Sequence, residues 1–236
     1  INSMQKNKKL IFVACDTSNL NQVKKIISQT KTNQLEIIPK FGLQFFYSKN
    51  GRTFLQDIKR NFWLDIKISD IPQTALSAID SLKDLKKCRY ITVHASGGIE
   101  MLKVVKKKVR SINKNIKILG VTILTSLNNK SLKEIGYKDD VNKLVLKQTN
   151  LIIKSGCDGV VCSAKEAKLL RKKYKNLFIV TPGIRLPGDN RNDQSRVVTP
   201  YEALIKNKVS GIVIGRSIIL GNIKKNIKRL IDHLNQ

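Results

Sequence analysis

Long apolar runs are missing from the sequence. No segment comes near the roughly 18 consecutive apolar residues that a membrane-spanning helix needs, so we expect no membrane span. The beginning of the chain, INSMQKNKKL, also lacks the apolar stretch of a signal peptide and leads directly into a strand-like run. We expect residues 1–9 to be an N-terminal extension, of which residues 1–3, ahead of Met4, are a remnant of an expression vector.

Cysteine and histidine are scarce. The chain has four cysteines and two histidines, and no two cysteines have the Cys-x-x-Cys spacing of a metal or redox motif. We therefore expect no metal site and no disulfide framework. Free thiols suit a reducing compartment, which predicts a cytoplasmic protein. The cysteines are Cys15, Cys88, Cys157 and Cys162.

Acidic and aromatic residues are also few. The 45 Lys and Arg residues exceed the 17 Asp and Glu residues by enough to give a formal net charge of +28, while only 6% of residues are aromatic. A nucleic-acid-binding protein is compatible with this charge and stays as an alternative. However, the basic residues are scattered over helix-like segments such as 103–110 and 204–209, and no aromatic stacking platform is evident. We interpret them as solvated helix faces and expect no specific nucleic-acid partner.

Eight short apolar runs recur along the chain, separated by segments such as 20–30 in which apolar residues are spaced by three and four. Near-continuous apolar strands that alternate with amphipathic helices are typical of a parallel sheet. Eight such units predict an α/β protein with a (β/α)₈ TIM barrel, formed by one domain over residues 10–236. The runs cover residues 10–16, 35–41, 61–68, 90–96, 116–126, 158–164, 177–184 and 211–218.

A doubly wound open sheet is the alternative fold. Such a sheet usually has a glycine-rich phosphate loop after its first strand, and the segment CDTSNL (15–20) contains no glycine. The barrel is therefore favoured.

Polar side chains stand where the predicted strands end. In a (β/α)₈ barrel the carboxyl ends of the strands form the face on which active sites lie. Polar residues at the ends of so many strands indicate a catalytic mouth. They are Asp16, Lys40, Asp65, Lys67, His94, Ser96, Thr125, Ser126, Ser163, Arg185 and Arg216.

The stretch WLDIKISDIPQT (63–74) concentrates charge between apolar flanks. Asp65 and Lys67 are two residues apart, so on a regular strand they point to the same face. Asp70 follows where the strand ends at Ile71-Pro72. Burying several charges without a purpose is costly, which favours a catalytic role for them.

On these residues the chain resembles the orotidine 5′-phosphate decarboxylase family in its short bacterial form, from Phe12 to about Ser217. The family usually has Phe-His at the positions of Ile68 and Ser69, and Asn at the position of Gln73. These departures leave the charged residues of the motif unchanged. The motifs are LDIKISDIPQT (64–74), VHASGG (93–98), VTILTS (121–126), DGVVCSAKEA (158–167), VTPGIR (180–185), DQSRVVTP (193–200) and VIGRS (213–217).

The resemblance implies conversion of orotidine 5′-phosphate to uridine 5′-phosphate and CO₂, in de novo pyrimidine biosynthesis and without a cofactor. Lys67 would stabilise the ring carbanion and protonate it, and Asp65 would lie near the substrate carboxylate. Lys40 would complete the alternating row of charges. His94 is expected to orient its neighbours.

Other site residues also follow from the resemblance. Asp70 and Thr74 would reach into the neighbouring subunit, which implies a homodimer with shared active sites. The implied substrate-binding residues are Asp16 on the ribose, Thr125 or Ser126 on the pyrimidine, Arg185, Gln194, Gly215 and Arg216 on the phosphate, and in addition Lys40, Ile71, Thr74 and Pro182.

The phosphate end can also be predicted from the residues themselves. Gly215 lets the backbone approach an anion and Arg216 supplies positive charge, at the recurrent phosphate site of these barrels. The Pro- and Gly-containing segment 185–195 lies on the same face and is suited to covering a ligand. A magnesium-dependent phosphosugar lyase of the same superfamily remains an alternative, although such relatives tend to have a carboxylate where this chain has Lys40.

Overall fold

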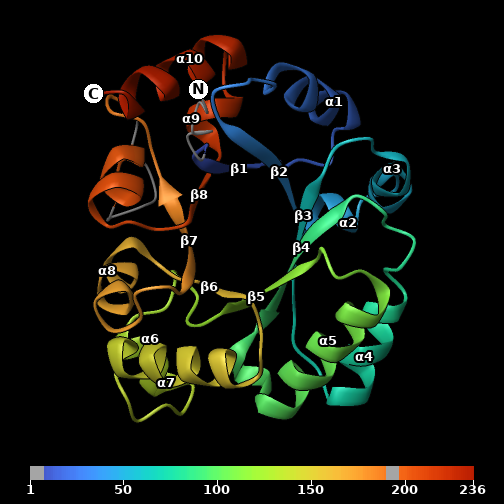
Figure 1. Ribbon diagram of the computed structural model, residues 1–236, viewed down its shortest axis with the longest axis vertical. Helices are drawn as coiled ribbons and strands as arrows, with labels where there is room; N and C mark the ends of the chain where they lie inside the picture. The colour runs from blue at the N-terminus through green and yellow to red at the C-terminus, as the bar shows by residue number, and fades with distance from the viewer. Residues whose placement is uncertain (1–7, 190–196) are drawn as a thin grey trace, which may run out of the picture.

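Eight parallel strands close into a barrel in the computed structural model, which describes residues 8–189 and 197–236 (Figure 1). Each strand pairs with the next along the chain, and β8 pairs with β1. The predicted (β/α)₈ barrel is confirmed. The strands are β1 Leu10–Ala14, β2 Glu36–Gly42, β3 Phe62–Ile68, β4 Cys88–His94, β5 Lys117–Val121, β6 Gly159–Val161, β7 Phe178–Ile184 and β8 Gly211–Ile214.

Helices surround the barrel (Figure 1). Several begin at a side-chain cap, in which an Asn, Asp or Ser oxygen accepts a hydrogen bond from a backbone N–H of the first turn, as Ser163 does for α8. The α-helices are α1 Leu20–Gln29, α2 Leu43–Phe46, α3 Gly51–Asp57, α4 Pro72–Asp80, α5 Ile99–Ile112, α6 Asn129–Glu134, α7 Val141–Lys154, α8 Ala164–Lys173, α9 Arg216–Ile219 and α10 Ile223–Leu234, with a 3₁₀ turn η1 Ala95–Gly97 and a π-helical turn η2 Glu202–Lys206.

Two predicted segments differ in extent from the elements that form. β5 ends at Val121, well before the end of the apolar run 116–126, so Thr125 and Ser126 lie on the loop that follows. The segment 204–209 is helical only in its first part, because η2 ends before Lys208, which has a left-handed φ of 53°. The helix expected over 20–30 is confirmed as α1.

Apolar side chains are buried on both sides of the sheet. One cluster fills the inside of the barrel and includes Phe12, Trp63 and Tyr90, while a larger cluster lies between the strands and the helices. This double burial explains why the strands are nearly continuous apolar runs. Within residues 8–189 and 197–236, no helix is both long and apolar enough to cross a membrane.

Candidate active site

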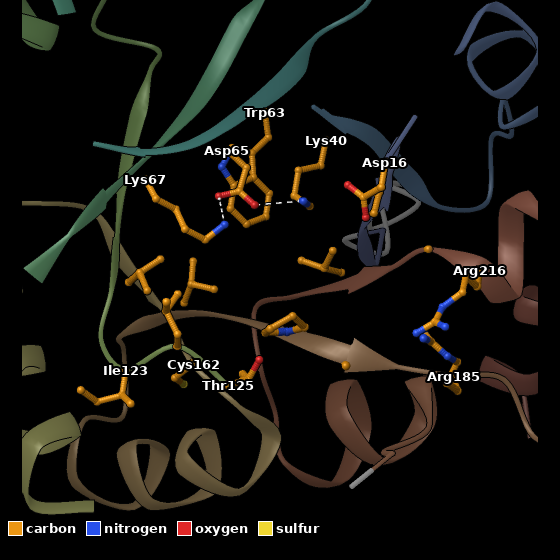
Figure 2. Close-up of a pocket in the computed structure, with 18 of the residues that line it drawn as sticks. Asp16, Lys40, Trp63, Asp65, Lys67, Ile123, Thr125, Cys162, Arg185 and Arg216 are labelled. Carbon is orange, nitrogen blue, oxygen red and sulfur yellow. Dashed lines mark hydrogen bonds and ion pairs between the residues drawn. The ribbon is translucent and has the colours of Figure 1, made fainter. Parts of the chain in front are cut away.

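A cavity of about 510 Å³ opens at the carboxyl ends of the strands (Figure 2). Its charged residues come from β2, β3 and the segments that follow β1, β7 and β8, so the barrel brings together positions far apart in the sequence. The lining residues are Ala14, Asp16, Lys40, Trp63, Asp65, Lys67, Val121, Ile123, Leu124, Thr125, Val161, Cys162, Pro182, Gly183, Arg185, Val213, Gly215, Arg216 and Ile219.

Three charged residues form a row along one wall of this cavity. The Lys40 ammonium lies 2.9 Å from Asp65 Oδ2, and the Lys67 ammonium lies 2.9 Å from Asp65 Oδ1 (Figure 2). Asp65 is only 6% exposed. Its two carboxylate oxygens therefore each meet a different lysine, which offsets much of the cost of burying the charge.

The electrostatics of the row keep Asp65 and Lys40 charged. Burial disfavours the Asp65 carboxylate, but the attraction of Lys40 and Lys67 outweighs burial and lowers the pKa of that carboxyl. Burial likewise disfavours the Lys40 ammonium, yet the nearby Asp65 and Asp16 outweigh it and raise the pKa of that lysine. Asp65 and Lys40 are therefore ionised at neutral pH.

The backbone at Lys67 is unusual. Leu64 pairs with Ile91 and Ile68 with Val93, so the register between β3 and β4 shifts between Leu64 and Ile68. Lys67 has a φ of 47°, a conformation that costs a residue other than glycine about 1–3 kcal/mol. The expectation that Asp65 and Lys67 share a face is confirmed, but an irregular strand brings them together rather than regular alternation.

Trp63 lines the cavity next to Lys40. Its Nε1 donates a 2.6 Å hydrogen bond to Thr92 Oγ1, and its ring packs edge-on against Phe12 with the centroids 4.7 Å apart. The Lys40 ammonium lies 5.8 Å from the Trp63 ring centroid, within the range of a cation–π contact. The contacts with Thr92 and Phe12 thus fix the indole in position next to Lys40.

Two arginines lie at the other end of the cavity. Arg185 follows β7 and Arg216 begins α9, and Figure 2 shows their guanidinium groups facing one another across from the lysines. The end of β7, which leads to Arg185, includes Gly183, whose φ of 77° favours glycine and which lies where the register against β8 shifts. Two adjacent cations attract an anion with more than one negative charge, such as a phosphate.

The comparisons with known proteins agree with this geometry. Residues 9–226 match the model of the orotidine 5′-phosphate decarboxylase / HUMPS family. The chain belongs to this family. It is 38% identical over 214 residues to an orotidine 5′-phosphate decarboxylase of Staphylococcus epidermidis, a match that covers 89% of this chain and 90% of the relative. A Coxiella burnetii protein of the same name is 36% identical over 221 residues, or 91% and 92% of the two chains.

Solved structures are similar to this chain in fold. The crystal structure of orotidine 5′-phosphate decarboxylase from Lactobacillus acidophilus aligns with a TM-score of 0.83 and 29% identity, covering 98% of this chain and 100% of that one. The Methanocaldococcus jannaschii enzyme, solved with the inhibitor BMP, aligns with a TM-score of 0.73 at 21% identity and supports the fold alone.

Most residues expected from the family resemblance line the cavity, including Thr125 and Pro182. The exposed Ser126 does not belong to the lining. Asp70, Ile71 and Thr74 are exposed too, and they lie between β3 and the first turn of α4, outside the cavity of their own chain. Gln194 lies outside the described residues.

The surroundings of His94 and Cys162 do not favour a catalytic role for either residue. His94 is half-buried, and burial together with the Lys67 ammonium lowers its pKa despite the nearby Asp65. The imidazole is therefore mainly neutral at neutral pH, which does not suit a general acid. Cys162 lines the cavity, but burial raises the pKa of its thiol well above the usual value, which makes it a poor nucleophile.

Several lining residues were not expected from the sequence. Trp63 lies two positions before Asp65, and this spacing places it on the same inward face, one layer deeper in the barrel. That signal was available in the strand pattern. The apolar Ile123 and Leu124 belong to a loop, and no periodicity marks a loop residue as part of a cavity.

Proposed function

We propose that the chain decarboxylates orotidine 5′-phosphate to uridine 5′-phosphate in de novo pyrimidine biosynthesis, without a metal or other cofactor. The observation that carries this proposal is the Lys40–Asp65–Lys67 row lying across the cavity from Arg185 and Arg216. The family membership and the names of the relatives support it. We take residues 10–236 as one catalytic domain.

Lys67 is the residue that we assign to the chemical step. When CO₂ leaves, the electron pair of the broken C–C bond stays on a ring carbon that has no adjacent π-acceptor. A fixed ammonium group stabilises that charge electrostatically as it develops. Lys67 then transfers a proton from Nζ to the same carbon and becomes a neutral amine, which solvent reprotonates.

Asp65 would raise the energy of the bound substrate relative to the transition state. Its carboxylate is kept ionised by Lys40 and Lys67 and is 6% exposed, so little water screens it. A substrate carboxylate placed beside it is repelled, and the repulsion is relieved as neutral CO₂ departs. Lys40 keeps Asp65 charged and in place.

The remaining lining residues are assigned to binding. We propose that Arg185 and Arg216 bind the phosphate, with Gly215 beside them, and that Asp16 accepts hydrogen bonds from the ribose hydroxyls. Gln194 would join the phosphate site.

We assign the pyrimidine to Thr125. Its presence in the cavity lining supports it over Ser126, which lies outside that lining. Pro182 contributes an apolar surface near the base.

A homodimer with shared sites is also part of the proposal. Ile71 is 66% exposed between Asp70 and α4, and a partner that covered this segment would bury it. Leu43 at the start of α2 and Tyr47 just after it are also exposed, and α2 contacts β3, the strand that precedes this segment. Asp70, Ile71 and Thr74 would then enter the partner's cavity. We further propose a cytoplasmic location, supported by four free cysteines.

The proposed activity is tested by mixing the purified protein with orotidine 5′-phosphate and following the loss of the substrate's ultraviolet absorbance. We expect turnover that is unchanged by an excess of chelator. Turnover that stops with chelator and returns with magnesium would indicate the metal-dependent superfamily members instead. No turnover under either condition would contradict the proposal.

A further inference from the structure

A second cavity of about 370 Å³ lies next to the first and shares Arg185 and Arg216 with it. Its far wall is formed by α10, through Asn226 and Arg229. We propose that Asn226 and Arg229 are positioning residues for the phosphate end of the site. The inference rests on the proposed function, because it takes Arg185 and Arg216 as the residues that bind the phosphate of the substrate.

Asn226 fixes the segment that follows Arg216. Its side-chain nitrogen donates hydrogen bonds to the carbonyl oxygen of Ile218 at 3.0 Å and to that of Leu220 at 2.7 Å. These carbonyls lie at the end of the short helix α9, whose first residue is Arg216. Both amide hydrogens of one side chain thus hold the turn that carries the arginine.

Arg229 fixes the segment that follows Arg185. Its Nη2 lies 2.8 Å from Asp189 Oδ1 and donates to the carbonyl oxygen of Pro187 at 3.3 Å. Its Nη1 donates to Asn226 Oδ1 at 3.3 Å. Because the Asn226 oxygen is engaged by Arg229, its amide nitrogen is oriented toward α9.

A third contact joins the two segments directly. The backbone N–H of Leu186 donates to Ser217 Oγ at 3.1 Å, and Ser217 is buried. Leu186, which follows Arg185, is therefore hydrogen-bonded to Ser217, which follows Arg216. Asn226, Arg229 and Ser217 together hold both arginine-bearing segments against α10.

The position of Asn226 on the buried face of α10 indicates that this hydrogen-bond network does more than fill the core. The buried face of α10 is otherwise made of Ile223, Ile227 and Leu230, and Asn226 is also buried, at 8% exposure. An apolar side chain fills such a position without any need for partners. The two guanidinium groups of Arg185 and Arg216 repel each other, so their backbones need support that does not depend on the ligand.

The test compares a nucleotide with the matching nucleoside, because only the nucleotide carries the phosphate. We would measure kcat and KM of Arg229→Met and Asn226→Asp with orotidine 5′-phosphate and with orotidine. Lys228→Met is the matched control, since it removes an equal charge from an exposed position of α10. The expected result is a KM for the nucleotide raised by about threefold to tenfold in each variant, which corresponds to the net contribution of one ordinary hydrogen bond.

Turnover of the nucleoside and the behaviour of Lys228→Met should stay within about twofold of the unmodified protein. Adding Asp189→Asn to Arg229→Met should cost no more than Arg229→Met alone, because both changes remove the same contact. Equal losses for nucleotide and nucleoside, or no loss for either, would overturn the inference. If the unmodified protein itself fails to turn over the nucleotide, the proposed function has failed instead.

Binding gives a readout independent of turnover. Trp63 is the only tryptophan of the chain and lines the first cavity, so its fluorescence reports ligand binding. Uridine 5′-phosphate should bind Arg229→Met about threefold to tenfold more weakly than the unmodified protein, while uridine binds both equally. A variant that weakens uridine binding to the same degree has lost the general shape of the site, and the positioning role is then wrong.

Discussion

Replacement of Lys40 by methionine tests whether the buried row of charges is as tightly coupled as its geometry indicates. The change removes an ammonium that lies 2.9 Å from Asp65 Oδ2, with both side chains about 90% shielded from solvent. Removing one partner of a buried ion pair costs about 3–5 kcal/mol, because the other charge is left without compensation. Asp65 keeps Lys67 at 2.9 Å, so we expect the lower end, about 3 kcal/mol of unfolding free energy.

The loss should depend on pH in a defined way. Asp65 has a lowered pKa in the folded protein, so it stabilises the fold above the unfolded-state pKa of about 3.9, and that stability is lost as the pH falls through the folded value. Lys40 has a raised pKa, so its contribution is present below about 10.4 and is lost as the pH rises through the folded value. The difference between variant and unmodified protein should be largest between about pH 4 and pH 10.

Urea unfolding at pH 7 and pH 3 measures this difference. Lys24→Met is the control, since Lys24 is exposed on α1. We expect the control to change the free energy of unfolding by less than about 0.5 kcal/mol. If Lys40→Met loses less than about 1 kcal/mol at pH 7, or loses as much at pH 3 as at pH 7, the row is not the coupled network described here.

Two further predictions concern binding and assembly. Arg216→Ala should raise the KM for orotidine 5′-phosphate and lower kcat, because binding energy at the phosphate is used at the reacting carbon, while turnover of orotidine barely changes; equal harm to both substrates would remove Arg216 from the phosphate site. Mixing Asp70→Ala with Lys67→Ala should restore about half the normal activity per mixed dimer, since both lesions fall on one of its two sites. Demonstrated subunit exchange without recovered activity would refute the shared site.

The fold and the charged half of the site could be predicted from local patterns. A strand buried on both faces must be apolar throughout, and eight such runs leave few arrangements other than the barrel. Charges at the ends of those runs are easily recognised, because nothing in a core requires them. Asp65, Lys67 and Arg216 were therefore visible in the sequence, and they line one cavity.

Other features depend on partners that the sequence does not reveal. The left-handed backbone of Lys67 arises where β3 shifts its register against β4, and no local propensity predicts it for a lysine. The hydrogen bond of Trp63 to Thr92 joins two strands, and the contact of Arg229 with Asp189 joins α10 to a distant loop. Such pairs follow from tertiary packing rather than from spacing along the chain.

The place of Asp70 shows a different limit. In the single chain, its side chain accepts a hydrogen bond from the backbone N–H of Ile71 and is exposed to solvent. If the residue serves a neighbouring subunit, its role becomes visible only when two copies are brought together. The family resemblance, rather than the geometry of one chain, carries that expectation.

In the proposed reaction, the Lys67 ammonium both stabilises and protonates the ring carbon from which CO₂ departs. The most direct measurement is single-turnover conversion of orotidine 5′-phosphate by Lys67→Ala beside the unmodified protein, with far-ultraviolet circular dichroism to establish that both are folded. We predict a loss of at least about 4 kcal/mol of transition-state stabilisation, on the order of a thousandfold in rate. A folded Lys67→Ala variant that retains even a tenth of the normal rate would contradict the account.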